Sequence, residues 1–136
     1  MKKISTVVKC IDYRQDGFFK NWLKNNGWEN SDIISVAGSV KDLVGEKEEI
    51  RNWLLSMIKI SHDGHGSREI ILTSHSTCGA YNIKDEEEEK KIQLEDLEKA
   101  KKIIKESFPD MKVNKFWLKL IGDHEETTDI IFDPID

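Results

Sequence analysis

The chain has 136 residues, of which 38% are hydrophobic and 35% are charged. This balance predicts one globular domain spanning residues 1–136 that needs neither disulfides nor a metal to fold. The 21 basic and 26 acidic residues give a net charge of −5, which argues against nucleic acid or an anionic membrane as the main partner. No apolar run approaches the roughly 18 residues of a membrane span, and no signal peptide is recognisable. We therefore expect a cytoplasmic protein that acts on a small molecule.

Apolar residues along the chain alternate between short strand-like runs and stretches with helical spacing. In chain order, the pattern predicts a strand over 4–9, a helix over 18–23, a strand over 33–37, a helix over 43–58, a strand over 69–73, a helix over 94–108, and two strands over 113–121 and 128–132. A polar turn over 122–126 joins the last two strands.

Strands that alternate with helices at this spacing predict right-handed crossover connections. We expect an α/β fold with a mainly parallel, Rossmann-like sheet of four to five strands, helices on both faces and the last strand antiparallel at the edge. Such sheets bind ligands beyond the carboxyl ends of their strands. The loops that begin at Cys10, Ala37 and His75 each follow a predicted parallel strand, so they should converge on one site.

Two cysteines and one histidine in these loops supply a ligand set for zinc. Zinc takes thiolate and imidazole ligands in tetrahedral geometry, and a catalytic site keeps three protein ligands. His75 and Cys78 are close enough in sequence to share one turn, and Cys10 arrives from the neighbouring strand. We also expect Cys78 to lie at the start of a helix, where the dipole favours a thiolate. Two other interpretations stay open: buried hydrophobic cysteines, or a redox pair that forms a disulfide.

Asp12 and Arg14 follow Cys10 directly and lie two residues apart. In an extended loop their side chains would point the same way and could pair through a bidentate contact. A carboxylate held by arginine stays ionised at neutral pH and can accept a hydrogen bond from a metal-bound water. The alternative is an ordinary surface ion pair, but the neighbouring metal ligand favours the catalytic interpretation.

These residues together resemble the β-class carbonic anhydrases, in their short, minimal form. The family pattern Cys-x-Asp-x-Arg occurs at Cys10–Arg14, an Ala-Gly turn follows the second strand at residues 37–38, and His-x-x-Cys-Gly follows the third at His75–Gly79. The resemblance extends from Ile4 to about Ala80. One departure is Ser35-Val36, where the family usually has Arg-Asn or Arg-Val.

The resemblance implies a zinc enzyme that reversibly hydrates carbon dioxide to bicarbonate. Its metal ligands would be Cys10, His75 and Cys78, and the dyad beside the bound water would be Asp12 and Arg14. Zinc lowers the pKa of its water towards about 7, so hydroxide is available to attack a small electrophilic carbon. The remaining pocket residues implied by the match are Ala37, Gly38 and Gly79.

Two rival functions remain open. The same site could attack carbonyl sulfide or carbon disulfide. Alternatively, Asp12 permanently occupies the fourth position of the metal, as in inactive family members, and the protein is a non-catalytic zinc-binding or bicarbonate-responsive module. A chain this short would leave the site and a sheet edge exposed, so we expect a homodimer or a higher homo-oligomer.

Other residues capable of chemistry receive structural interpretations. His62 and His65 precede the third strand, so they should lie at the opposite, amino-end edge of the sheet. His124 falls in the last predicted turn. The acidic run over residues 85–89 is expected to be the solvated start of a helix. The tryptophans expected in the core or at a dimer contact are Trp22, Trp53 and Trp117.

Overall fold

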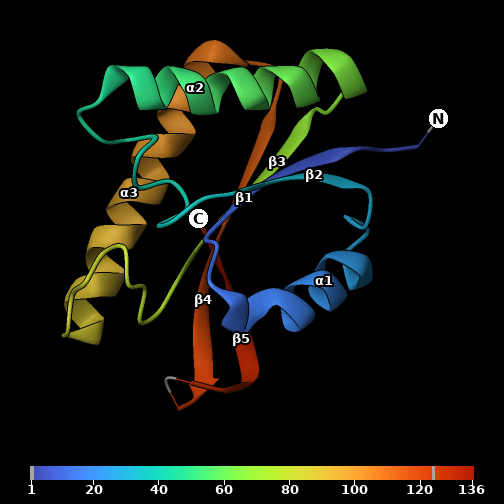
Figure 1. Cartoon of the computed structure of the whole chain (residues 1–136). Helices are drawn as coiled ribbons and strands as arrows, with labels where there is room; N and C mark the ends of the chain where they lie inside the picture. The colour runs from blue at the N-terminus through green and yellow to red at the C-terminus, as the bar shows by residue number, and fades with distance from the viewer. Residues whose placement is uncertain (1, 124) are drawn as a thin grey trace.

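A computed structural model describes residues 2–123 and 125–136. Within these residues five strands form one sheet in the order β2-β1-β3-β4-β5 (Figure 1). The elements are β1 (Ser5–Lys9), a 3₁₀ turn η1 (Tyr13–Gln15), α1 (Asp16–Asn25), β2 (Ser31–Ser35), α2 (Glu48–Lys59), a π-helical turn η2 (Ile60–Gly64), β3 (Glu69–His75), α3 (Glu86–Ser107), β4 (Lys112–Gly122) and β5 (Thr127–Ile135).

The strand directions confirm the predicted α/β fold. β1 pairs in parallel with β2 and with β3, and β3 pairs in parallel with β4. β5 runs antiparallel to β4 and forms the edge of the sheet. All residues of β1 and β3 are buried, as expected for central parallel strands that are covered on both faces.

Neighbouring residues of a strand point to opposite faces of the sheet, and each face has its own apolar layer. Val7 packs with Phe19 and Leu23 of α1. Val8 packs in the other layer, which contains Leu54 of α2 together with buried residues of α3. Figure 1 shows α1 on one side of the sheet, and α2 and α3 on the other. Helices therefore cover both faces, as predicted.

The start of α2 differs from the prediction. Leu43 was expected in the helix because of its spacing, and it is buried, but it lies in an irregular turn before Glu48. The guanidinium of Arg51 donates to the backbone carbonyls of Leu43 and Gly45. These carbonyls therefore have hydrogen-bond partners although they lie outside the helix. The apolar residues before Glu48 are buried as parts of a loop.

The acidic run forms the start of α3, as predicted, and the helix begins at Glu86, ahead of the apolar spacing that starts at Leu94. The carboxylate of Asp85 caps the helix by accepting from the backbone N–H of Glu88 at 3.2 Å. Acidic side chains in a first turn interact favourably with the helix dipole. The acidic run is thus helical, and four of its carboxylates, on residues 85–88, are exposed as expected.

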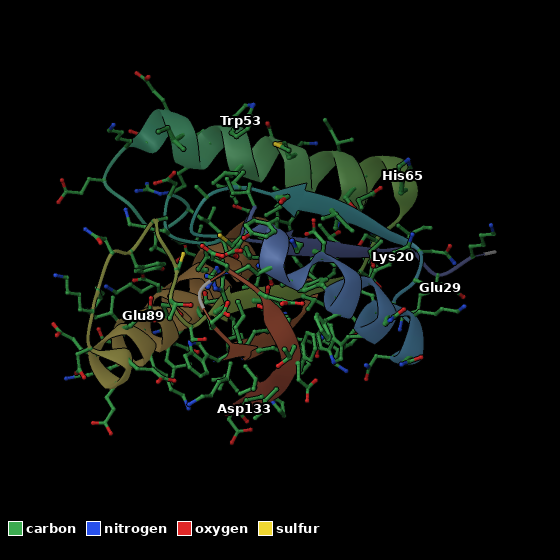
Figure 2. The ribbon with its side chains drawn as sticks, turned by 60° about the horizontal axis from the view of Figure 1, so that its bottom comes forward. Lys20, Glu29, Trp53, His65, Glu89 and Asp133 are labelled. Atoms are coloured by element: carbon green, nitrogen blue, oxygen red, sulfur yellow. The ribbon has the colours of Figure 1, made fainter. Side chains whose placement is uncertain are left out.

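The three tryptophans have different environments. Trp117 is buried and donates through Nε1 to Gln93 Oε1 at 2.7 Å. Trp22 is partly buried and stacks on Phe132, with ring centroids 4.4 Å apart. Trp53 is 56% exposed on the outer side of α2 (Figure 2). Trp53 therefore lies outside the core, because its position in the helix faces away from the sheet, and for this residue only the dimer contact stays a prediction.

The histidines before β3 lie at the amino-end edge of the sheet, as predicted. His65 contacts Asp32 at the start of β2, with 2.7 Å between Nδ1 and Oδ2. His62 lies between Asp63 and Asp110, at 2.7 and 2.8 Å, and its backbone carbonyl accepts from Arg68. His124 lies outside the described residues. None of the helices in residues 2–123 and 125–136 is long and apolar enough to cross a membrane.

His62 makes the free energy of unfolding of the protein dependent on pH. Its hydrogen bonds to Asp63 and then Asp110 raise the pKa of the imidazole above its ordinary 6.5, against small opposing effects of burial and Arg68. A group whose pKa is higher in the folded state than in the unfolded state stabilises the protein. The stabilisation is complete at pH values below the unfolded-state pKa, and it is lost as the pH rises through the folded-state pKa.

We therefore expect His62→Gln to lower the free energy of unfolding near pH 6 and to have little effect near pH 9. The effect is modest because the carboxylates are exposed and screened by solvent. Urea unfolding of both proteins at the two pH values measures it. A loss of stability that is equal at both values would contradict this assignment.

Candidate metal centre

The chain leaves the two central strands, β1 and β3, towards opposite faces of the sheet. After β1 the chain continues into η1 and α1, whereas after β3 it continues towards α3 in the other layer. The gap between such neighbouring strands is the topological switch point, where ligands bind in open α/β sheets. Cys10 directly follows β1, and His75 is the last residue of β3.

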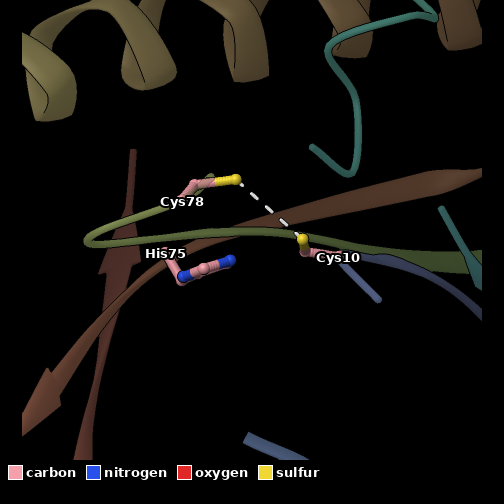
Figure 3. A group of neighbouring side chains, drawn as sticks. All are labelled: Cys10, His75 and Cys78. Carbon is pink, nitrogen blue, oxygen red and sulfur yellow. Dashed lines mark hydrogen bonds between the residues drawn. The ribbon is translucent and has the colours of Figure 1, made fainter. Parts of the chain in front are cut away.

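Cys10, His75 and Cys78 meet at this point. Each has one donor atom within 4.8 Å of the others, and all three residues are buried. The two sulfur atoms lie 3.9 Å apart, and the imidazole of His75 is turned towards them (Figure 3). Among the predicted site residues these are the three that could hold a metal ion as a group.

The orientation of His75 fits metal binding. Its Nδ1 lies 2.7 Å from the backbone carbonyl of Ser76, which can only accept, so Nδ1 carries the proton and the lone pair is on Nε2. Nε2 is buried and has no hydrogen-bond partner. A buried acceptor left unsatisfied is costly, and a hydrogen bond that fixes the other nitrogen is the usual support of a metal-binding histidine.

The two thiols also fit a divalent cation. The hydrogen bond from Cys78 lowers the pKa of Cys10, and the backbone N–H of Gly38 adds to this effect, whereas burial opposes it. The hydrogen bond to Cys10, together with burial, raises the pKa of Cys78. Without a cation the pair therefore retains one proton. Two thiolates and a neutral imidazole are a ligand set that zinc prefers.

Cys78 does not lie at the start of a helix, so that prediction is wrong. It belongs to an irregular loop, and α3 begins only at Glu86. Thr77, just before it, has the left-handed φ of +53°, which turns the chain sharply. Backbone N–H groups of Ala80 and Tyr81 contact the thiol of Cys78 and favour its thiolate, the role that the helix dipole was expected to play.

Glu89 is a site residue that the sequence analysis missed. It belongs to the acidic run that was expected to be solvated, but it is only 1% exposed. Its Oε1 accepts from the backbone N–H of Thr77 at 2.8 Å, and its Oε2 accepts from that of Cys78 at 2.9 Å. The available signal was spacing: the buried stripe of α3 comprises Glu89, Gln93, Leu97, Ala100 and Ile104.

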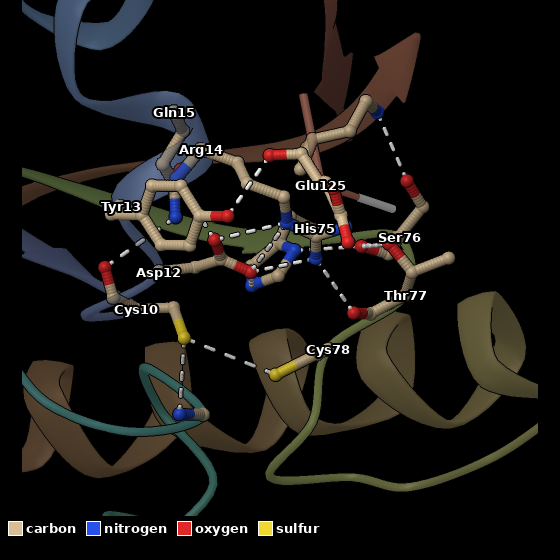
Figure 4. A network of polar contacts seen from close by, with 12 residues as sticks. Cys10, Asp12, Tyr13, Arg14, Gln15, His75, Ser76, Thr77, Cys78 and Glu125 are labelled. Carbon is tan, nitrogen blue, oxygen red and sulfur yellow. Dashed lines mark hydrogen bonds and ion pairs between the residues drawn. The ribbon is translucent and has the colours of Figure 1, made fainter. Parts of the chain in front are cut away.

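Asp12 and Arg14 form a bidentate pair beside the ligands (Figure 4). Oδ2 of Asp12 accepts from Arg14 Nη2 at 2.7 Å, and Oδ1 accepts from Nε at 3.1 Å. Asp12 also caps η1, since Oδ1 accepts from the backbone N–H of Arg14 at 3.0 Å. The pair therefore arises from a 3₁₀ turn, not from the extended loop that we expected.

The pair connects the ligand loops to one another. Arg14 Nη2 donates to the backbone carbonyl of Thr77 at 2.9 Å, and Asp12 Oδ2 lies 3.8 Å from His75 Nε2. Burial raises the pKa of Asp12, but the side-chain and backbone hydrogen bonds from Arg14 outweigh it and keep that pKa below its ordinary value. The carboxylate is therefore an ionised acceptor near the candidate metal position.

A pocket of about 530 Å³ is lined by one candidate ligand, Cys10, and by the Asp12–Arg14 pair. Its rim carries two apolar side chains, Ile11 and Tyr13, which are 60% and 69% exposed. The residues lining the pocket are Cys10, Ile11, Asp12, Tyr13, Arg14, Ala37, Thr77, Gly79 and Ala80. The pocket thus combines one ion pair with a mostly apolar wall, which suits a small uncharged molecule.

Gly38 supports the site through its backbone. Its N–H donates to Cys10 Sγ at 3.4 Å, and its φ of +78° lies in the left-handed region. A Cβ at this position would lie 3.0 Å from Cβ of Lys41 and 3.1 Å from Cβ of Ala80. A Cβ at Gly79 would meet nothing within 4 Å. The two glycines predicted to shape the pocket therefore differ in what they require.

We expect Gly38→Ala to lower the free energy of unfolding by about 1–3 kcal/mol, because it combines a left-handed backbone with close contacts. Gly79→Ala is the matched control, and its effect should stay within about 0.5 kcal/mol. Chemical denaturation of both variants measures the difference. Equal effects at the two positions would contradict the proposed role of Gly38.

Comparisons with known proteins agree with this geometry. Residues 1–127 match the profile of a family described as "Putative carbonic anhydrase". An uncharacterized protein of Rickettsia bellii is 34% identical over 127 residues, which cover 85% of this chain and 76% of that protein.

Solved β-carbonic anhydrases share the fold. A tetrameric β-carbonic anhydrase from Sordaria macrospora has a TM-score of 0.59 at 13% identity, covering 88% of this chain and 77% of that one. A carbonic anhydrase from Glaciozyma antarctica has a TM-score of 0.59 at 16% identity, covering 96% of this chain and 81% of that one. The profile match confirms the resemblance read from the motifs: the chain belongs to the family described as "Putative carbonic anhydrase", and it shares the fold of the β-carbonic anhydrases.

Proposed function

We propose that this chain catalyses the zinc-dependent, reversible hydration of carbon dioxide to bicarbonate. The observation that carries the proposal is the buried cluster of Cys10, His75 and Cys78, in which His75 Nε2 has no partner and faces the two sulfurs. These three residues would hold the ion. When bound, zinc supplies Lewis-acid activation of water near neutral pH.

Asp12 would orient the attacking water. Its carboxylate is ionised and can only accept hydrogen bonds, so a water between Oδ2 and the ligand cluster must direct an O–H towards it. Arg14 occupies both oxygens from the other side and leaves the carboxylate little freedom to rotate. The lone pair of that water is thereby directed into the pocket.

The wall of the pocket fits the proposed substrate. Ile11, Ala37 and Ala80 provide apolar contact for a small linear molecule without net charge. The backbone carbonyl of Thr77, which accepts from Arg14 Nη2, adds a polar group beside the dyad. Carbonyl sulfide and carbon disulfide share this shape, so comparing kcat/KM for the three substrates decides which electrophile the site prefers.

A second candidate function follows from the position of Asp12. Its Oδ2 lies only 3.8 Å from His75 Nε2, close enough for Asp12 to become a fourth ligand. The protein would then be a zinc-binding or bicarbonate-responsive module without catalysis. A reducing compartment such as the cytoplasm, which we propose for this chain, would keep both thiols available in either case.

We expect the purified protein to contain about one zinc ion per chain and to hydrate carbon dioxide in a stopped-flow assay. Cys78→Ser should lose zinc and activity together, because it removes a thiolate ligand. Asp12→Ala should retain zinc and lose about 100-fold in kcat/KM, the usual range for a removed proton acceptor. Asp16→Ala, an exposed aspartate at the start of α1, is the matched control.

Three outcomes would contradict parts of this proposal. Stoichiometric zinc without hydration would favour the non-catalytic module, as would an Asp12→Ala variant more active than the unmodified protein. A protein without zinc after expression in zinc-replete medium, with Cys10 and Cys78 joined by a disulfide, would favour a redox function instead.

We further propose that the chain assembles as a homodimer or a higher homo-oligomer. Exposed Ile11 and Tyr13 beside the pocket and the open edge of β2 support this, and the Sordaria macrospora relatives are described as tetrameric. Light scattering during gel filtration should give at least twice the mass of one chain, and Ile11→Lys should reduce it. Ile60→Lys changes a similarly exposed isoleucine in η2, at the amino ends of the strands, and should leave the mass unchanged. A single-chain mass would contradict assembly.

A further inference from the structure

We propose that Glu89 is a positioning residue that pre-forms the His75–Cys78 loop for the metal. The inference rests on the proposed function, since it concerns the same ligands. Glu89 lies in the first turns of α3, on the opposite side of the loop from Asp12 and Arg14. Nothing in the zinc-binding pattern of the sequence points to it.

The first argument is the burial of the carboxylate. A residue with an acidic side chain is almost never fully buried unless its oxygens are paired. Glu89 is 1% exposed, and each oxygen accepts one backbone N–H, from Thr77 at 2.8 Å and from Cys78 at 2.9 Å. One side chain thus accepts from the N–H groups of two successive peptides, so this contact fixes the orientation of both.

The second argument is the conformation of the loop. Thr77 has a φ of +53°, and a β-branched residue in this region is strained. Such a conformation persists only where surrounding groups hold it. Glu89 holds the N–H of Thr77, and Arg14 Nη2 holds its carbonyl at 2.9 Å. Thr77, which lies between the two ligands His75 and Cys78, is therefore held through both its N–H and its carbonyl.

The third argument is the geometry of the ligands themselves. The left-handed turn at Thr77 lets His75 and Cys78 face the same point, within 4.8 Å of Cys10. If Thr77 relaxed to an ordinary conformation, the direction of the chain at Cys78 would change. Glu89 thus acts on the metal through the backbone of a ligand residue, and it contacts neither substrate nor metal.

The test compares Glu89→Gln with Glu87→Gln. Glutamine has one acceptor oxygen, and its amide nitrogen would face a backbone N–H that can only donate. We expect Glu89→Gln to weaken zinc binding by about 10- to 100-fold in a chelator competition, the usual effect of losing an outer support. Glu87→Gln removes the same charge from an exposed side chain of the same turn, and its zinc affinity should equal that of the unmodified protein.

A spectroscopic measurement separates positioning from general stability. Cobalt(II) reports ligand geometry through its visible absorption bands, and these should change in Glu89→Gln but not in Glu87→Gln. Equal zinc affinity and identical cobalt spectra in the two variants would overturn the proposal. So would a Glu89→Gln protein whose affinity falls while its cobalt spectrum is unchanged, because that result indicates only lower stability.

A measurement on the unmodified chain applies even if Glu89→Gln does not fold. Hydrogen exchange by NMR should show the amide protons of Thr77 and Cys78 already protected in the metal-free protein. Rapid exchange that slows only after zinc is added would show that the metal orders the loop, and would overturn the inference. Failure of the unmodified protein to bind zinc would instead reject the proposed function, independently of this amide protection.

Discussion

The parallel pairing of β1 with β3 is the constraint on which the rest of the structure depends. Its register places Val7 opposite Ile71 and Val8 opposite Leu72. Both strands are buried on both faces, and a slip by one residue would move every side chain into the wrong layer. The packing of α1 on one face and of α2 and α3 on the other therefore fixes the distance between Cys10 and His75, although neither residue contributes much to the apolar layers.

The amino ends and the carboxyl ends of the strands differ in a way that explains why chemistry is expected only at the carboxyl ends. At the amino-end edge, both nitrogens of His62 face carboxylates, and Asp32 accepts from Ser61 and contacts His65. The two histidines and their carboxylate partners satisfy one another, which is typical of a structural network. At the carboxyl-end edge His75 Nε2 is buried with an open lone pair beside two thiols. The unsatisfied acceptor marks the edge where a cation would stabilise the protein.

The candidate centre gathers several acidic side chains in a small volume. Two thiols, Asp12 and Glu89 lie around one loop, and Arg14 is ion-paired with Asp12. Backbone N–H groups supply further compensation, at Gly38 for Cys10 and in the Thr77–Cys78 turn for Glu89. Backbone amides add no net charge and are held in place by the chain, so they can stabilise the ligand side chains without binding the metal themselves. A divalent cation bound by Cys10, His75 and Cys78 would complete this balance.

The sequence by itself determined the layout of the strands and helices, because apolar periodicity is a local property of the chain. It indicated the three candidate ligands as well, because Cys10 and the His75–Cys78 loop each follow a predicted parallel strand. It also indicated that Asp12 and Arg14 belong together, though through the wrong backbone conformation. Only the tertiary structure decided that Glu89 supports the ligand loop and that Cys78 lies outside a helix. These features depend on how α3 docks against β3, and a carboxylate within an acidic run is indistinguishable from its neighbours until that docking selects which one is buried.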